Sequence, residues 1–231
     1  MFLKKIYNQV HILHNLFLKE KVFLNKKTYS SDGVDLVLSK YFKSNFKGFY
    51  VDVGCYHPTR ANNTYLLYKK GWRGINIDVS KFSIDLFNFW RTRDINICRA
   101  VTNKNGFSKL YYQKKFSLLT TLNKKQAKTS FQGKIKKKLI RCSTLTTVIN
   151  QTMFTKKKID FLNIDAEAND FNILKSLDFK IYRPTCICVE DASLHYNNTD
   201  NIKNSKIYIF LKKHNYKHVS SGIFDHLYVS N

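Results

Sequence analysis

Short apolar runs alternate with segments of helical periodicity through most of the chain. The apolar runs of strand length are 49–53, 74–78, 95–101, 159–165 and 185–190. The segments whose apolar residues recur at helical spacing are 63–70, 81–90, 170–177 and 202–215. This alternation predicts an α/β fold with a mostly parallel sheet that is covered by helices on both faces. Two further runs around Ser221 and Gly222 predict a C-terminal hairpin, which adds antiparallel strands at one edge of the sheet.

The first 45 residues have a helical pattern of their own. Apolar residues recur at helical spacing over residues 1 to about 28, and Ser30 or Ser31 is placed to cap a second, short helix. We predict an N-terminal helical extension over 1–45 that packs on a single domain over 46–231. The lysines that flank the first helix leave open a peripheral membrane contact or a partner-docking role.

Length and composition are those of one folded domain. The chain has 231 residues, of which 43% are hydrophobic, so it buries a full core and is not disordered throughout. Lysine and histidine interrupt the N-terminal apolar pattern, and no run approaches about 18 uninterrupted apolar residues, so we expect neither a signal peptide nor a membrane span. The five cysteines form no C-x-x-C pair, which predicts reduced thiols and no metal site. The default expectation is a cytoplasmic protein.

The formal charge of +24 first suggests a polyanionic partner. Only seven of the 40 basic residues are arginine, however, and the accompanying Asn, Ile, Phe and Tyr share A/T-rich codons with lysine. The charge is concentrated between Asp94 and Asp160, where sixteen basic residues occur without an acidic one. We predict a basic insertion at about 104–141, which is either a solvated surface or a region that attracts an anionic acceptor.

Polar residues follow the predicted strands at the edge where parallel sheets bind ligands. Asp52 and Gly54 end the first strand, and Asp78 ends the second. A glycine permits a tight turn close to a ligand, and a carboxylate after the second strand can accept hydrogen bonds from a ribose. Asp78 as the N-cap of the next helix is the alternative. Because G-x-G-x-x-G and a P-loop are both absent, the pattern favours an adenosine-containing ligand whose phosphates need no cradle.

A cluster of carboxylates follows the fourth strand. Asp165, Glu167 and Asp170 lie within six residues, and buried together they would need a cation, a proton or hydrogen-bond donors. The alternative is a solvated helix N-terminus, where negative charge is favourable.

Three stretches together resemble the FkbM family of S-adenosylmethionine-dependent methyltransferases. They are VDVGCYHPTRANNTYLLYKKGWRGINIDVS, IDFLNIDAEANDFNILKSLDF and PTCICVE, and the likeness covers roughly residues 30 to 192. Family members typically show a D-x-G turn, an Asn-Thr helix start, G-W-x-G before the second strand and I-D-x-E-G-x-E after the fourth. The order and spacing of these motifs are more specific than any one of them.

The resemblance implies a Rossmann-like class I methyltransferase with a seven-stranded sheet and S-adenosylmethionine as cofactor. Asp52 and Gly54 would form the cofactor turn, Asp78 would hold the ribose, and Ala100 and Val101 would lie against the adenine.

Asp165 and Glu167 match the D-x-E of the family, whereas Ala168 replaces its usual Gly and Asp170 its usual Glu. We expect Asp165 to position the acceptor near the methyl group and Glu167 to act as the base or its orienting partner. His57 and His195 are the other candidate bases.

The expected reaction is methylation of a hydroxyl on a sugar, glycan or small-molecule acceptor, and the segment SLLTTL (117–122) offers hydroxyls to bind it. The charge makes an anionic acceptor such as a nucleotide-sugar the second expectation. Two other functions stay open. One is an RNA methyltransferase, which charge and aromatic content favour, although no RNA-binding module is visible. The other is a catalytically silent protein that binds anionic ligands with the same fold.

Overall fold

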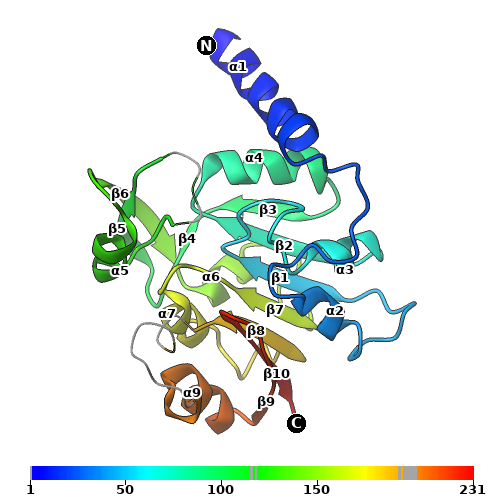
Figure 1. The fold of residues 1–231 in the computed structure, drawn as a ribbon. Helices are drawn as coiled ribbons and strands as arrows, with labels where there is room; N and C mark the ends of the chain where they lie inside the picture. The colour runs from blue at the N-terminus through cyan, green and yellow to red at the C-terminus, as the bar shows by residue number, and fades with distance from the viewer. Residues whose placement is uncertain (1, 115–116, 118, 192–193, 195–201) are drawn as a thin grey trace.

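The computed structural model describes residues 2–114, 117, 119–191, 194 and 202–231 and is built on a twisted central sheet (Figure 1). Its strands lie in the order β3–β2–β1–β7–β8–β10–β9. The bounds are β1 Phe49–Val53, β2 Arg73–Asp78, β3 Ile95–Cys98, β7 Phe161–Ile164, β8 Cys186–Glu190, β9 Tyr216–Ser221 and β10 Asp225–Ser230. The five strands from β3 to β8 pair in parallel, and β10 pairs antiparallel with both β8 and β9. The predicted mostly parallel α/β sheet is confirmed.

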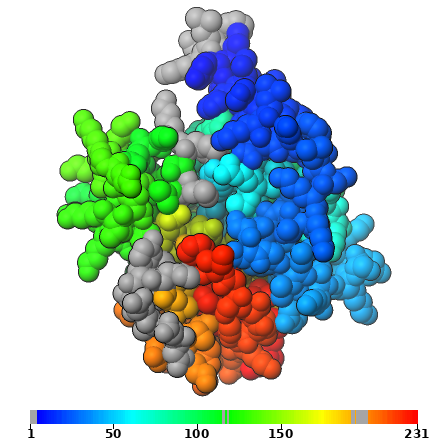
Figure 2. Space-filling view, in the orientation of Figure 1, coloured from blue at the N-terminus to red at the C-terminus, as the bar shows by residue number. Residues whose placement is uncertain are grey.

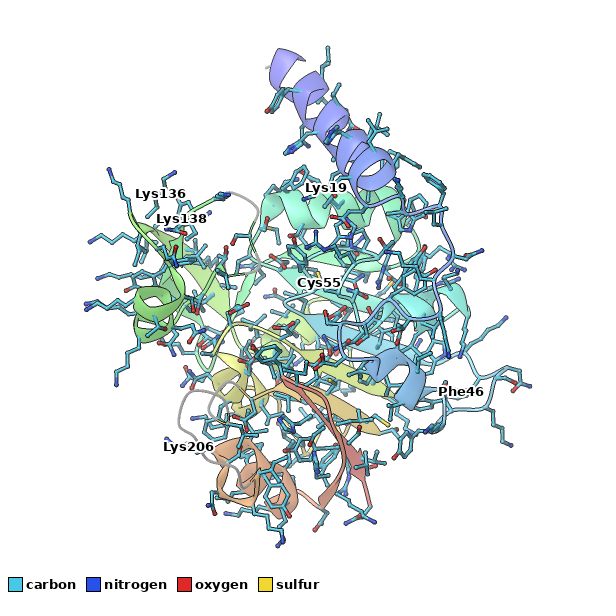
Figure 3. All side chains as sticks on the ribbon, in the orientation of Figure 1. Lys19, Phe46, Cys55, Lys136, Lys138 and Lys206 are labelled. Carbon is cyan, nitrogen blue, oxygen red and sulfur yellow. The ribbon has the colours of Figure 1, made fainter. Side chains whose placement is uncertain are left out.

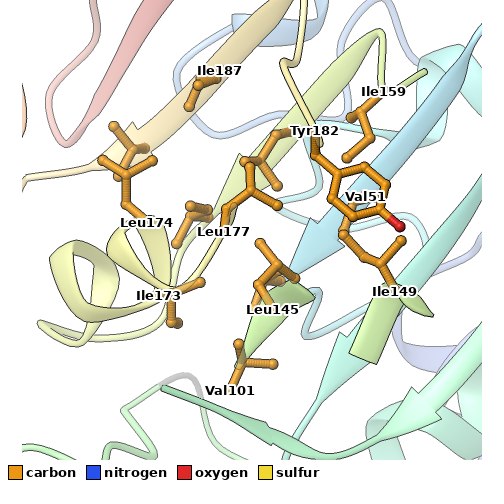
Figure 4. Close-up of a cluster of buried hydrophobic side chains, with 14 of the residues drawn as sticks. Val51, Val101, Leu145, Ile149, Ile159, Ile173, Leu174, Leu177, Tyr182 and Ile187 are labelled. Atoms are coloured by element: carbon orange, nitrogen blue, oxygen red, sulfur yellow. The ribbon is translucent and has the colours of Figure 1, made fainter. Parts of the chain in front are cut away.

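Helices cover both faces of this sheet, as the two-sided burial of its strands requires. They are α2 Val34–Leu38, α3 Tyr65–Lys69, α4 Lys81–Trp90, α6 Leu145–Asn150, α7 Asp170–Lys175 and α9 Lys206–Lys213, with the 3-10 turn η2 Ile202–Asn204 before α9. Within β1, Val51 joins the core formed with α6, α7 and α9, whereas Tyr50 joins the core formed with α2 and α3. Figure 4 shows the first of these cores, where Leu145, Ile173 and Ile187 converge.

The predicted third strand over 95–101 is wrong in its second half. The pairing of β3 with β2 stops at Cys98 because β2 itself ends at Asp78, and the Arg99 N–H donates to the Asp78 carbonyl over 2.9 Å. The next two residues form β4 (Ala100–Val101), which pairs with another strand, β6 (Lys136–Ser143). β6 also pairs antiparallel with β5 (Gly106–Tyr112), so a second, three-stranded sheet begins where β3 ends.

This small sheet and α5 (Lys124–Ser130) occupy the segment predicted as a basic insertion. Figure 3 shows lysine side chains, including Lys136 and Lys138, extending from it away from the central sheet.

The N-terminal segment contains α1 (Phe2–Leu13) and continues as the short π-helix η1 (His14–Lys19). It is attached to α4 through contacts of Ile12 and Leu16 with Leu86, and through a hydrogen bond of 3.2 Å from Asn8 Nδ2 to Asp85 Oδ2. The first turns of α1 extend beyond the rest of the molecule (Figure 1). In the part of the chain that the structure describes, none of the helices has the length and apolar character needed to cross a bilayer.

Candidate functional site

Two adjoining cavities open at the carboxyl ends of the parallel strands. Val53, Asp78 and Val101 line the first, which lies over β1, β2 and β4. Asp52, Asn163, Glu190 and Asp225 line the second, which lies over β1, β7, β8 and β10. Gly54, Asp165 and Glu167 line both cavities and therefore mark the boundary between them.

Gly54 forms the turn that brings the ends of β1 and β7 together. Its φ is +81°, and a Cβ at this position would lie 1.7 Å from the carbonyl oxygen of Asp165. The residue after Val53 must therefore be glycine, because a side chain would separate the two loops that form the boundary.

Asp78 is held rigidly at the first cavity. Its Oδ2 accepts a hydrogen bond of 2.9 Å from the Tyr56 N–H, and its Oδ1 accepts one of 2.7 Å from the Ser80 N–H. Ser80, rather than Asp78, is the N-cap of α4, since its Oγ accepts from the Ser83 N–H. Burial raises the pKa of Asp78 to about 6. A fixed carboxylate beside a cavity is suited to accept hydrogen bonds from the hydroxyls of a ribose.

The walls beside Asp78 are mainly apolar. Ile77, Val79, Val101 and Leu110 line them, so this part of the first cavity combines apolar residues with the anchored carboxylate of Asp78. This chemistry fits a nucleoside and therefore fits the adenosine part of the expected cofactor. Ala100, predicted beside Val101, is buried and lines neither cavity.

Asp52 belongs to a closed hydrogen-bond network and is fully buried. Its carboxylate accepts from Thr64 Oγ1 at 2.7 Å, Asn163 Nδ2 at 2.9 Å and Asn62 Nδ2 at 3.2 Å. Arg91, also fully buried, donates to Thr64 Oγ1 at 2.7 Å and to Asn62 Oδ1. Thr64 and Asn62 therefore link the guanidinium to the carboxylate, and Asp52 holds the 58–64 loop against β1.

The carboxylates at the second cavity have far fewer donors. Burial, with Glu190 and Asp225 nearby, holds the pKa of Asp165 well above its usual range. Burial raises the pKa of Glu167 to about 7 and, with help from neighbouring carboxylates, that of Glu190 to about 9. Glu190 Oε2 is buried and accepts no hydrogen bond from any described residue. These groups share protons, as carboxylates placed side by side must.

The loop after β7 has an unusual backbone. Glu167 and Ala168 have φ values of +52° and +65°, so two consecutive non-glycine residues adopt the left-handed conformation. Thr121 Oγ1 donates to the Glu167 carbonyl at 2.6 Å, and Asn123 Nδ2 donates to the Ala168 carbonyl at 3.2 Å. Through Thr121, the 117–122 segment that was expected to offer hydroxyls is attached to this loop. Ser117 and Thr120 of the same segment line the first cavity.

Of the two histidines expected as candidate bases, the structure describes His57. His57 Nδ1 accepts from the backbone N–H groups of Thr59 and Arg60, and its Nε2 lies 3.0 Å from Asn15 Oδ1. Burial and nearby cations lower the pKa of His57 to about 3, and the residue lines neither cavity, so it stabilises a turn. His195 lies outside the described residues.

Several residues of the second cavity were not predicted. Glu190 ends β8, as Asp78 ends β2, and Asn163 is a polar residue within a buried strand. The sequence pattern could therefore have identified both as candidate site residues. Asp225 begins β10, and it reaches the same edge because β10 runs antiparallel. Asn63 Nδ2 connects these residues through hydrogen bonds to Asn163 Oδ1 at 2.9 Å and Asp225 Oδ2 at 3.0 Å.

Among the described residues, no group of three or more His, Cys, Asp or Glu side chains is arranged to hold a metal ion. The arrangement is a cavity with apolar walls and an anchored Asp78 beside a second cavity lined by carboxyl groups. A search of curated proteins finds no match. The family model described as the methyltransferase FkbM domain matches residues 52–218, a range that includes Asp52, Asp78, Asp165 and Glu190. The chain therefore belongs to the FkbM methyltransferase family.

Proposed function

We propose that this methyltransferase uses S-adenosylmethionine to methylate a hydroxyl of a sugar, glycan or small-molecule acceptor. The observation that carries the proposal is that the two cavities meet at Gly54, Asp165 and Glu167. A donor in the first cavity and an acceptor in the second would then meet at a carboxylate-lined boundary.

The first cavity supports the donor half of the proposal. Asp78 would accept hydrogen bonds from the ribose hydroxyls, and Val101 with Leu110 would contact the adenine. When bound, S-adenosylmethionine supplies an electrophilic methyl group on a positively charged sulfur. Asp165, at the boundary, would place its carboxyl group beside the expected position of that sulfur.

Glu167 is the group best suited to remove the acceptor proton. It lies at the boundary, and a pKa of about 7 leaves a substantial fraction deprotonated at neutral pH while keeping it a useful base. Asp165 beside it would align the acceptor oxygen with the methyl group and share the released proton.

The charge of the second cavity bears on the acceptor. Six of its lining residues are acidic, and none of its described lining residues is Lys, Arg or His; the acidic ones are Asp32, Asp52, Asp165, Glu167, Glu190 and Asp225. A phosphate or carboxylate beside the reacting hydroxyl would therefore find no cation among these described lining residues, which disfavours an anionic group there. We therefore propose that the reacting end of the acceptor is neutral, and that any anionic part would contact the lysines of β5 and β6 outside the cavity (Figure 3).

A labelled-methyl assay over a panel of glycans, nucleotide-sugars and RNA tests the reaction. We expect Glu167→Gln to lower turnover by about 10²- to 10⁴-fold, the usual contribution of a general base. Since the base acts deprotonated, activity of the unmodified enzyme should rise with pH to a plateau above about 7, and the variant should lose this dependence. Glu20→Gln, which removes the charged partner of Arg60 outside both cavities, is the matched control and should behave as wild type.

Three results would contradict the proposal. Wild-type turnover in a folded Glu167→Gln variant would exclude the assigned base. Methylation of RNA alone would favour the RNA methyltransferase. Cofactor binding without transfer to any hydroxyl acceptor would favour a catalytically silent protein.

A further inference from the structure

The N-terminal helix α1 is apolar on two different faces. Ile12 is buried and packs toward Leu86 of α4, as expected for the face that attaches the helix. Ile6, Val10 and Leu13 lie within an arc of about 60°, roughly 130° around the helix from Ile12. Their side chains are 45%, 59% and 44% exposed. The helix therefore presents a second apolar stripe to solvent.

Further apolar side chains are exposed near this stripe. Tyr7, about 60° around the helix from Val10, is 73% exposed, and Leu18, Phe23 and Leu24 are exposed in the segment that follows. The segment stands at one end of the molecule (Figure 2). Apolar side chains gathered in this way mark a contact surface, whereas singly scattered ones need no explanation.

The charge around the stripe indicates the partner. Residues 1–28 contain six lysines and a single acidic residue, Glu20, whose carboxylate is engaged by Arg60 at 2.7 Å. A second copy of the chain would bring the same net charge of +24, so repulsion opposes self-association through this surface. A nucleic acid would attract the lysines but would offer no apolar phase for isoleucine, valine and leucine.

We infer that the N-terminal segment docks the enzyme on an anionic membrane surface. The helix would lie in the plane of the interface, with Ile6, Val10 and Leu13 at the boundary of the acyl chains and the lysines at the lipid headgroups. This role is independent of the proposed reaction, because the stripe lies outside both cavities. It places the methyltransferase beside acceptors that are held at, or delivered to, a membrane.

The test is sedimentation of the full chain with phosphatidylcholine vesicles that contain either no anionic lipid or about 30% phosphatidylserine. Val10→Glu and Gln9→Glu are a matched pair, since each adds one negative charge at neighbouring exposed positions of α1 and only the first lies on the stripe. We expect wild type and Gln9→Glu to bind the anionic vesicles, and Val10→Glu to bind about tenfold or more weakly. Circular dichroism verifies that both variants remain folded.

The inference would be overturned by any of four results. The first is that wild type does not bind anionic vesicles. The second is that both variants lose binding equally, which would show that the added charge, and not the apolar stripe, causes the loss. Alternatively, sedimentation velocity shows self-association that Val10→Glu abolishes, or the chain binds RNA and ignores vesicles.

Discussion

Asp52 lies near the carboxyl end of β1 and Asp165 directly follows the adjacent parallel strand β7, but their carboxylates have opposite surroundings. Asp52 accepts three side-chain hydrogen bonds and lies in the field of the buried Arg91. The ionisable neighbours of Asp165 include Glu190, Asp225 and Glu167, and each of them raises the pKa of Asp165. The pKa values of these three neighbours are themselves raised. The polar network around Asp52 has its hydrogen-bond donors and is satisfied, whereas the carboxyl groups around Asp165 have far fewer donors among the described residues and are not.

This difference separates the scaffold from the site. A buried polar group that has all its partners fixes a conformation, whereas buried groups that lack them lower stability and persist where function requires them. By this criterion Asp52, Asn62, Thr64 and Arg91 are positioning residues. Glu167 and Asp165 are the groups available for chemistry.

The largest effect is expected on the satisfied side, from Arg91→Met. The change removes donors to the Pro58 carbonyl, Thr64 and Asn62 and leaves Asp52 without a compensating charge. Breaking a buried ionic network typically costs about 3–5 kcal/mol, and we expect that loss in the free energy of unfolding from urea denaturation.

Arg60→Met is its control, because Arg60 is partly exposed and, among the described residues, its ion pair is with Glu20 alone. It should cost less than about 1 kcal/mol. Equal losses for the two variants would mean that the Arg91 network does not support the fold as described.

On the unsatisfied side, Glu190→Gln is expected to stabilise the protein. Folding raises the pKa of Glu190 from 4.5 to about 9, so between these values the folded state retains a proton that the unfolded state has lost. Stability of the wild type therefore falls as pH rises through this range, and glutamine removes that dependence. Since each pKa unit corresponds to about 1.4 kcal/mol, we expect a gain of at least about 1–2 kcal/mol at pH 8 and almost none at pH 4.

Urea denaturation of both proteins at the two pH values measures this difference. Glu20→Gln again serves as the matched control and should shift stability equally at both. A gain from Glu190→Gln that did not change with pH would show that the cost of ionising Glu190 in the folded protein is not its cause.

The smallest effect concerns the strained loop on the same side. Ala168 has a φ of +65°, where glycine is free of the steric cost that a Cβ imposes. Ala168→Gly should therefore raise the free energy of unfolding by about 0.5–1 kcal/mol. Ala127→Gly, in α5, should instead lower it by about 1 kcal/mol, because glycine is unfavourable in a helix. Destabilisation by both changes would show that the loop is not strained at Ala168.

Much of the architecture followed from local pattern. β1, β2, β7 and β8 lie within two residues of their predicted bounds, because each is a mainly apolar run that is buried on both faces. The break at Arg99 was not predictable from the same pattern. Apolar residues continue through Val101, and only the end of β2 and the presence of β6 decide where that strand changes sheet.

The site was predicted best where strand order determines position. Gly54, Asp78, Asp165 and Glu167 meet at the cavities because parallel strands end at one edge. Local sequence could not reveal that Asp52 is enclosed by Asn62, Thr64 and Asn163. Asn163 lies 111 residues away, and the loop with Asn62 and Thr64 reaches Asp52 only by folding back on β1. The net charge was misleading for the cavity itself, because a chain of +24 has concentrated carboxylates there.

The central claim is that Asp78 and the first cavity hold the nucleoside part of S-adenosylmethionine. Titration calorimetry with S-adenosylmethionine tests it on three proteins: wild type, Asp78→Asn and the matched control Asp85→Asn, which changes a carboxylate on α4 outside both cavities. We predict saturable binding to wild type and Asp85→Asn, and affinity at least about tenfold lower for a folded Asp78→Asn, as expected for loss of hydrogen bonds to a charged group. Absence of binding to wild type at millimolar cofactor, or equal affinity in all three proteins, would contradict the account.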